Sequence, residues 1–192
     1  MKNAKAIQRV QVVGVSDEER ALVDALAAAQ VLTDPKKRHF KTKLDVALVG
    51  CPDGTRMRSF LKMLLMMYEP KCRQSVKFHP LLRHGGGMVL NPESLIVNHG
   101  STLASDLLDE MRDAVGMGYK AIILSTHLPC RKARNNGISP LAVIGSLAKA
   151  KARIKEEIPG ITVVCVLQVN SEELYFFSKT KFEAWLKEHK LK

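Results

Sequence analysis

The chain has 192 residues, of which 46% are hydrophobic and only 5% aromatic, and its formal net charge is +11. This length and composition suit one globular domain with an aliphatic core, with or without a terminal extension. Four cysteines do not make a disulfide scaffold, the first residues do not resemble a secretory signal peptide, and no apolar run is long enough to span a membrane. We therefore expect a cytoplasmic protein with no membrane partner.

The N-terminal part of the sequence predicts an extension with one short strand and one helix. Residues 10–15 form a Val-rich run typical of a strand, and the helical pattern that follows begins at an S-x-x-E capping box. The basic stretch KKRHFKTK at 36–43 then predicts a linker. We divide the chain accordingly into an N-terminal strand/helix extension with its basic linker, residues 1–43, and an α/β domain of catalytic type, residues 44–192.

In the α/β domain, apolar runs typical of buried strands alternate with helical patterns. The predicted strands are 44–50, 75–82, 119–126, 161–169 and 173–178, and the predicted helices are 57–70, 101–118, 139–160 and the C-terminal segment from residue 179. Such alternation predicts an α/β fold with a mostly parallel central sheet flanked by helices. The short turn between the last two strands predicts an antiparallel hairpin at one edge.

Two of the predicted strands are followed by residues of the types that bind zinc. Cys51 directly follows one buried strand, and His127 and Cys130 follow another in an H-x-x-C spacing. Functional sites of parallel sheets lie at the carboxyl ends of the strands. A Cys, His, Cys set is a zinc set, and three protein ligands leave the fourth tetrahedral position for water, as in catalytic zinc sites. The sequence therefore predicts Zn²⁺ bound by Cys51, His127 and Cys130.

Asp53 and Arg56 follow Cys51 closely enough to reach the same site. Asp53 could ligate the metal or accept a proton from zinc-bound water, and Arg56 could hold the carboxylate off the metal through a bidentate pair. The alternative is that Asp53 and Gly54 only form a turn, as Asp-Gly pairs often do.

Three other motifs fail in detail. Cys51 has no Arg six residues later, as a phosphatase loop requires. The HGGG stretch at 84–87 would suit the oxyanion loop of an esterase, but the chain contains no G-x-S-x-G. A G-x-G-x-x-A match at 116–121 lies between a helix and the next strand, which reverses the order of a dinucleotide-binding loop.

The order of these stretches resembles that of the β-class carbonic anhydrases. In that family a buried strand leads into C-x-D-x-R, a second strand ends in a stretch like R-N-A-G, and a helix and strand then lead into H-x-x-C. The corresponding stretches here are CPDGTR, LLRHGGG, the predicted helix 101–118 and THLPC, and with the final hairpin the resemblance covers 44–178. It departs from the family in the N-terminal strand, in Arg83-His84-Gly85-Gly86 where R-N-A-G would stand, and at two positions beside the predicted ligands. The family's Arg falls on Thr55 here, one residue before Arg56, and Arg131 replaces the Gly that follows the second Cys.

The resemblance implies a β-carbonic-anhydrase-like fold and a zinc lyase that reversibly hydrates carbon dioxide to bicarbonate with zinc-bound hydroxide. It also implies a homodimer or higher homo-oligomer. Cys51, His127 and Cys130 would bind the zinc. Asp53 would orient the hydroxide and Arg56 would orient Asp53. The glycines of the HGGG stretch, among them Gly85 and Gly86, would let backbone approach the substrate pocket closely.

Three alternatives stay open beside the carbonic anhydrase. The first is a non-catalytic zinc-site relative in which Asp53 closes the fourth coordination position. The second is a hydrolase of another small electrophile, such as carbon disulfide or carbonyl sulfide. The third, which is less favoured, is an α/β protein that binds nucleic acid through the basic segment 36–43 and the C-terminal tail.

Overall fold

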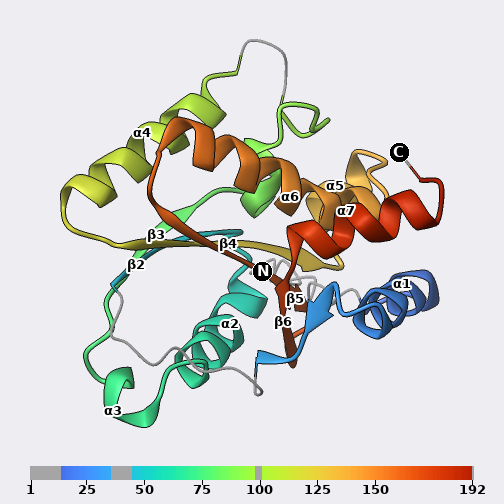
Figure 1. Cartoon of the computed structure of the whole chain (residues 1–192), viewed down its shortest axis with the longest axis horizontal. Helices are drawn as coiled ribbons and strands as arrows, with labels where there is room; N and C mark the ends of the chain where they lie inside the picture. The colour runs from blue at the N-terminus through green and yellow to red at the C-terminus, as the bar shows by residue number, and fades with distance from the viewer. Residues whose placement is uncertain (1–13, 36–44, 98–100, 192) are drawn as a thin grey trace, which may run out of the picture.

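A six-stranded mixed sheet forms the centre of the protein, in the strand order β1-β6-β5-β4-β2-β3 (Figure 1). The structure is a computed structural model that describes residues 14–35, 45–97 and 101–191. The strands are β1 (Leu32–Thr33), β2 (Val46–Gly50), β3 (Phe78–Leu82), β4 (Ala121–Leu128), β5 (Thr162–Val169) and β6 (Glu173–Phe177). Strands β3, β2, β4 and β5 are parallel, whereas β6 and β1 are antiparallel to their neighbours. The predicted α/β class, with a mostly parallel sheet and an antiparallel edge hairpin, is confirmed.

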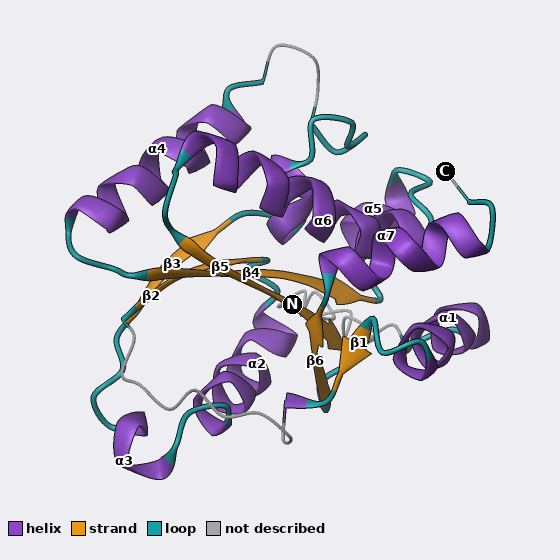
Figure 2. Cartoon of the chain, in the orientation of Figure 1, coloured by secondary structure: helices purple, strands orange, loops and turns teal. Residues whose placement is uncertain are grey.

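Helices cover both faces of this sheet (Figure 2). They are α1 (Asp17–Ala28), α2 (Gly54–Met66), α3 (Pro70–Arg73), α4 (Leu103–Gly116), α5 (Arg131–Asn135), α6 (Pro140–Glu157), α7 (Lys179–Glu188) and a 3-10 helix, η2 (Gly86–Leu90). Helices α1, α4, α6 and α7 contribute to one hydrophobic core, and α2 contributes to a second core on the opposite face. Every residue of β2 and β4 is buried, as their continuous apolar runs predict. None of the helices in the described ranges has the length and apolarity that a membrane crossing needs.

Three predicted boundaries near the site are wrong. Helix α2 begins at Gly54 rather than at residue 57, so Arg56 lies in its first turn rather than in a loop. Strand β4 continues to Leu128, so His127 is a strand residue rather than part of the following loop. Pro70 opens the short helix α3 instead of ending α2, because proline is well tolerated in a first helical turn.

Parts of the predicted N-terminal extension lie outside the described residues. The predicted linker at 36–43 does so entirely. Of the predicted strand at 10–15, only Gly14 and Val15 are described, and neither is in a strand. The described part belongs to the same sheet and core as the rest, because β1 pairs with β6 and Leu26 of α1 is fully buried.

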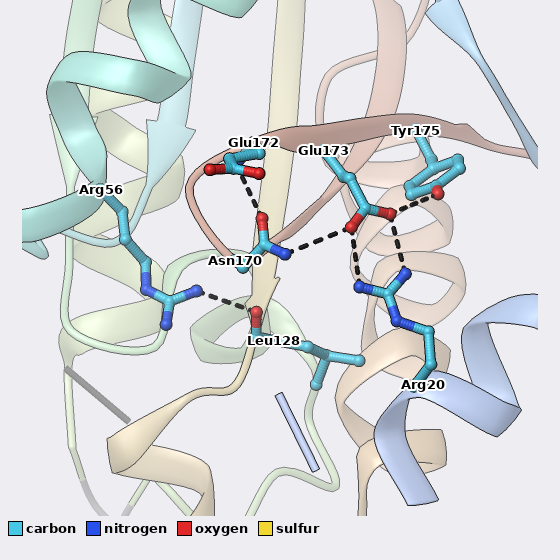
Figure 3. Close-up of polar contacts among 7 residues, drawn as sticks. All are labelled: Arg20, Arg56, Leu128, Asn170, Glu172, Glu173 and Tyr175. Atoms are coloured by element: carbon cyan, nitrogen blue, oxygen red, sulfur yellow. Dashed lines mark hydrogen bonds and ion pairs between the residues drawn. The ribbon is translucent and has the colours of Figure 1, made fainter. Parts of the chain in front are cut away.

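Helix α1 has the predicted capping box and is tied to the β5–β6 hairpin. The Glu19 amide donates to Ser16 Oγ at 3.2 Å, and the Ser16 amide donates to Glu19 Oε2 at 2.9 Å. The Arg20 guanidinium then donates to both carboxylate oxygens of Glu173, at 2.9 and 2.7 Å. Figure 3 shows Glu173 also accepting hydrogen bonds from Tyr175 and Asn170. These donors, Arg20 above all, lower the pKa of Glu173 to about 2.

The Glu173 network predicts an acid-dependent loss of stability. Because the folded-state pKa of about 2 lies below the ordinary value of 4.5, the stabilisation is fully present above pH 4.5 and is lost as the pH falls toward 2. We expect the wild type to melt at a higher temperature than Glu173→Gln at neutral pH, and the difference to shrink through this window. Circular dichroism melts at several pH values measure it. A difference that stays constant down to pH 2 would contradict the assignment.

Candidate metal centre

A small cavity lies at the carboxyl ends of β2 and β4, beside the first turn of α2. Its volume is about 10 Å³, enough for roughly one water molecule. Its walls are formed by Cys51, Asp53, Arg56, Met57, Phe60, Ser125, Thr126, His127 and Gln168. Four of the five residues predicted to form the zinc centre therefore share one cavity. The fifth, Cys130, is the N-terminal cap residue of α5, two residues past the end of β4.

His127 is held in a defined tautomer. Its Nδ1 lies 3.0 Å from the carbonyl oxygen of Pro129, and because a carbonyl only accepts, Nδ1 carries the proton and donates. Nε2 then carries a free lone pair. That atom is buried and has no hydrogen-bond partner among the described residues. Burial, with Arg56 nearby, lowers the pKa of His127 to about 4, so the ring is neutral at pH 7. This is the state in which histidine binds metals.

The two predicted cysteine ligands are free thiols just past the ends of β2 and β4. Burial raises the pKa of Cys51, and hydrogen bonds from the backbone of Gly85 and Asp53 oppose that rise. Burial also raises the pKa of Cys130, against hydrogen bonds from the first turn of α5. A negative charge on Cys130 would further raise the pKa of Cys51. Both thiols are therefore neutral unless a cation is present to stabilise the thiolates.

Arg56 connects Asp53 to the strand that carries His127. Its Nε lies 3.5 Å from Asp53 Oδ2, and its Nη1 donates to the Leu128 carbonyl at 2.8 Å. The side chain is deeply buried, with 5% of the residue exposed. Asp53 also caps α2, but it does so with its backbone carbonyl, which accepts from the amide of Met57. The turn function and the contact with Arg56 therefore coexist, although Arg56 lies one position beyond the family's Arg.

The predicted glycines pack against the Cys51 loop. Gly86 has φ +55°, and a Cβ added to it would lie 2.6 Å from the Ser125 carbonyl oxygen and 3.2 Å from the Cys51 amide. Gly85 has φ +98° and hydrogen-bonds Cys51 through its backbone. The close backbone approach thus positions Cys51, while a role for Gly85 and Gly86 toward substrate stays a prediction.

Sequence reasoning missed Gln168, which lines the cavity from β5. It pairs in register with His127, and its Nε2 donates to Ser59 Oγ at 3.3 Å. The sequence marks Gln168, because it is the single polar residue in the run 163–169, which is otherwise apolar. Met57 and Phe60 of α2 were also missed, and they form the apolar part of the wall.

The predicted ligands are chemically suited to zinc, but they are not arranged around one metal position in this structure. Among the described residues, no three His, Cys, Asp or Glu side chains are arranged so that they could hold a metal ion. The unpartnered Nε2 of His127 and the two neighbouring thiols are nevertheless the ligand types that zinc prefers. Metal binding would therefore require a rearrangement of these side chains.

The Gly86 backbone yields a direct test of this local packing. We expect Gly86→Ala to lower the free energy of unfolding by about 1–3 kcal/mol, because its positive φ is strained for alanine and the Cβ would meet the Ser125 carbonyl. Gly116→Ala is the control, because nothing lies within 4 Å of the Cβ it would add. Urea denaturation measures both. Equal stability of Gly86→Ala and the wild type would contradict the packing described here.

Comparisons with known proteins give one distant match. No protein-family model matches the chain, and no curated protein matches it. Among solved structures, the crystal structure of β-carbonic anhydrase isoform I from the protozoan Trichomonas vaginalis matches with a TM-score of 0.42 and 16% sequence identity. The match covers 84% of this chain and 97% of that one. Similarity at this level assigns neither a family nor an activity, so the functional argument rests on the residues of the site.

Proposed function

We propose that the protein binds one Zn²⁺ through Cys51, His127 and Cys130 and reversibly hydrates carbon dioxide to bicarbonate. The observation that carries this proposal is the neutral, buried His127 whose Nε2 has no described hydrogen-bond partner, in a cavity that it shares with Cys51 and Asp53. An orphaned buried nitrogen costs free energy, and a metal ion would satisfy it. Bound zinc would lower the pKa of a water molecule toward neutrality and make it a nucleophile.

The Asp53–Arg56 pair is suited to orienting that water. Arg56 is anchored on the Leu128 carbonyl, so the guanidinium has a fixed position from which it holds Asp53. A carboxylate paired in this way can accept a hydrogen bond from water. The pair also disfavours the non-catalytic alternative, because a carboxylate held by Arg56 is less available to close the metal's fourth position.

The size of the cavity bears on the substrate. About 10 Å³ of space beside Met57 and Phe60 holds roughly one water molecule, so the cavity has to open for any substrate and the smallest candidate requires the least opening. We favour carbon dioxide over carbon disulfide and carbonyl sulfide because sulfur is larger than oxygen. The proposal includes a homodimer or higher homo-oligomer, which the resemblance implies.

Metal binding is tested on the full chain with cysteine variants. We expect the wild type to hold about one zinc per chain after dialysis and to hydrate carbon dioxide well above the buffer rate, because three protein ligands suffice for a catalytic site. Cys51→Ser should lose both properties. Cys72→Ser is the matched control, since Cys72 is a buried thiol on α3. Elemental analysis and stopped-flow hydration measure the outcomes. Zinc retained by Cys51→Ser, or none in the wild type, would refute the ligand set.

The role of Asp53 is tested separately. We expect Asp53→Asn to keep its zinc and to lower kcat about 10²- to 10⁴-fold, the usual range for losing a proton-transfer group. Asp109→Asn is the matched control, because Asp109 pairs with Arg112 at the same i,i+3 spacing but is exposed on α4. Stopped-flow hydration and a zinc-competition titration measure the two effects. If Asp53→Asn instead loses zinc affinity, Asp53 is a ligand and the non-catalytic alternative gains.

A further inference from the structure

Two consecutive residues of α1 form ion pairs with the elements that follow β4 and β5. The buried Glu19 carboxylate binds Arg134 of α5 at 2.7 Å, only four residues after Cys130. Arg20 binds Glu173 at the start of β6. Glu19 and Arg20 therefore connect α1 both to α5, which follows the segment that carries His127 and Cys130, and to the β5–β6 hairpin.

Further hydrogen bonds link the Arg20–Glu173 pair to the backbone of the segment 127–130. The Glu173 carboxylate accepts a hydrogen bond from the side-chain amide of Asn170, Nδ2, at 3.2 Å. The backbone amide of Asn170 donates to the Leu128 carbonyl at 2.8 Å. The Leu128 carbonyl is also the acceptor for the Arg56 guanidinium, as Figure 3 shows. One chain of polar contacts thus leads from α1 to the residue between His127 and Pro129 and on to Arg56.

These polar contacts matter because α1 does not fill the space behind the segment. A cavity of about 260 Å³ lies there, and its walls include Glu19, Leu128, Cys130 and Arg134. A loop beside such a space has room to shift unless directed contacts fix it. The Glu19–Arg134 ion pair is formed by two residues of the cavity wall, and the Arg20–Glu173 pair ties α1 to the adjacent hairpin. Together these contacts supply that fixation.

We propose that Glu19 and Arg20 are positioning residues, which hold the 127–130 segment in the conformation that presents His127 Nε2 and Cys130 to the metal centre. The part of this inference that concerns zinc rests on the proposed function. The part that concerns the segment does not, because the contacts exist without the metal. Neither residue touches the reacting groups, so each acts through the backbone of the segment.

The test uses a double variant with a matched control. Glu19→Gln keeps the capping box, which accepts Gln at this position. It removes the negative charge with which Arg134 forms its ion pair. Arg20→Met keeps the apolar stem and removes the guanidinium. The control is Arg112→Met, because Arg112 likewise forms ion pairs on the surface, with Asp109 and Glu157, and is similarly exposed at 42% against 37% for Arg20.

The first readout is amide hydrogen exchange of the metal-free full chain. The reporters are the amides of Asn170, bound to Leu128 O, and of Arg134, bound to Cys130 O. We expect exchange at both to be at least about tenfold faster in the double variant than in the wild type, because local opening becomes easier. Unchanged exchange at these amides, or the same acceleration in Arg112→Met, would overturn the positioning claim.

The second readout is the zinc dissociation constant, measured by chelator competition. We expect the double variant to bind zinc about 10- to 100-fold more weakly, as is usual when residues that orient metal ligands are lost. An unchanged constant in a variant with faster exchange would overturn the link between α1 and the metal centre. A wild type without zinc would overturn the proposed function, and the exchange rates alone would then decide whether α1 holds the segment.

Discussion

The geometry of the candidate centre depends on the two hydrogen bonds that the Leu128 carbonyl accepts. This carbonyl accepts one hydrogen bond from the Asn170 amide and another from the buried Arg56 guanidinium, each at 2.8 Å. A buried cation is tolerated only when its donors are satisfied, so Arg56 and this carbonyl fix each other. Leu128 lies directly after His127 in β4. These hydrogen bonds therefore set the positions of the strand end, of α2 and of the β5–β6 hairpin.

Burial keeps the three predicted zinc ligands uncharged in the absence of a metal. His127 is neutral because burial lowers its pKa, and burial raises the pKa of Cys51 and Cys130. These three groups are thus uncharged donors that become good ligands once protons leave the thiols. Arg56 is the neighbouring cation, but it is committed to Leu128 and Asp53. A divalent metal would satisfy the bare nitrogen of His127 and both thiolates at once.

Much of the fold could be predicted from local patterns, because β2 and β4 are continuous apolar runs and the α1 capping box is a local motif. The first turn of α2 was missed because Gly54 is a poor helix former and its preference was overridden by tertiary context. Strand β4 was ended too early because His127 is polar, although it is buried in the sheet. Strand β1 is only two residues long and is set by its pairing with β6, far away in the sequence.

The residues of the candidate site could be predicted from the sequence, but the contacts that hold them in place could not. Cys51, Asp53 and His127 were found because they stand at strand ends. By contrast, Glu173 lies 153 residues from Arg20, and the Leu128 carbonyl is a backbone atom that no sequence motif marks. The contacts that orient the site are therefore long-range, and only the folded chain brings them together.

The most direct test of the central claim is the zinc K-edge absorption spectrum of the zinc-loaded full chain. We predict a four-coordinate shell with two sulfur ligands at about 2.3 Å and two nitrogen or oxygen ligands at about 2.0 Å, from two cysteines, one histidine and one water. A shell without sulfur would mean that zinc binds elsewhere on the protein and would contradict the proposed centre. A shell with a single sulfur would show that Cys51 and Cys130 do not act together.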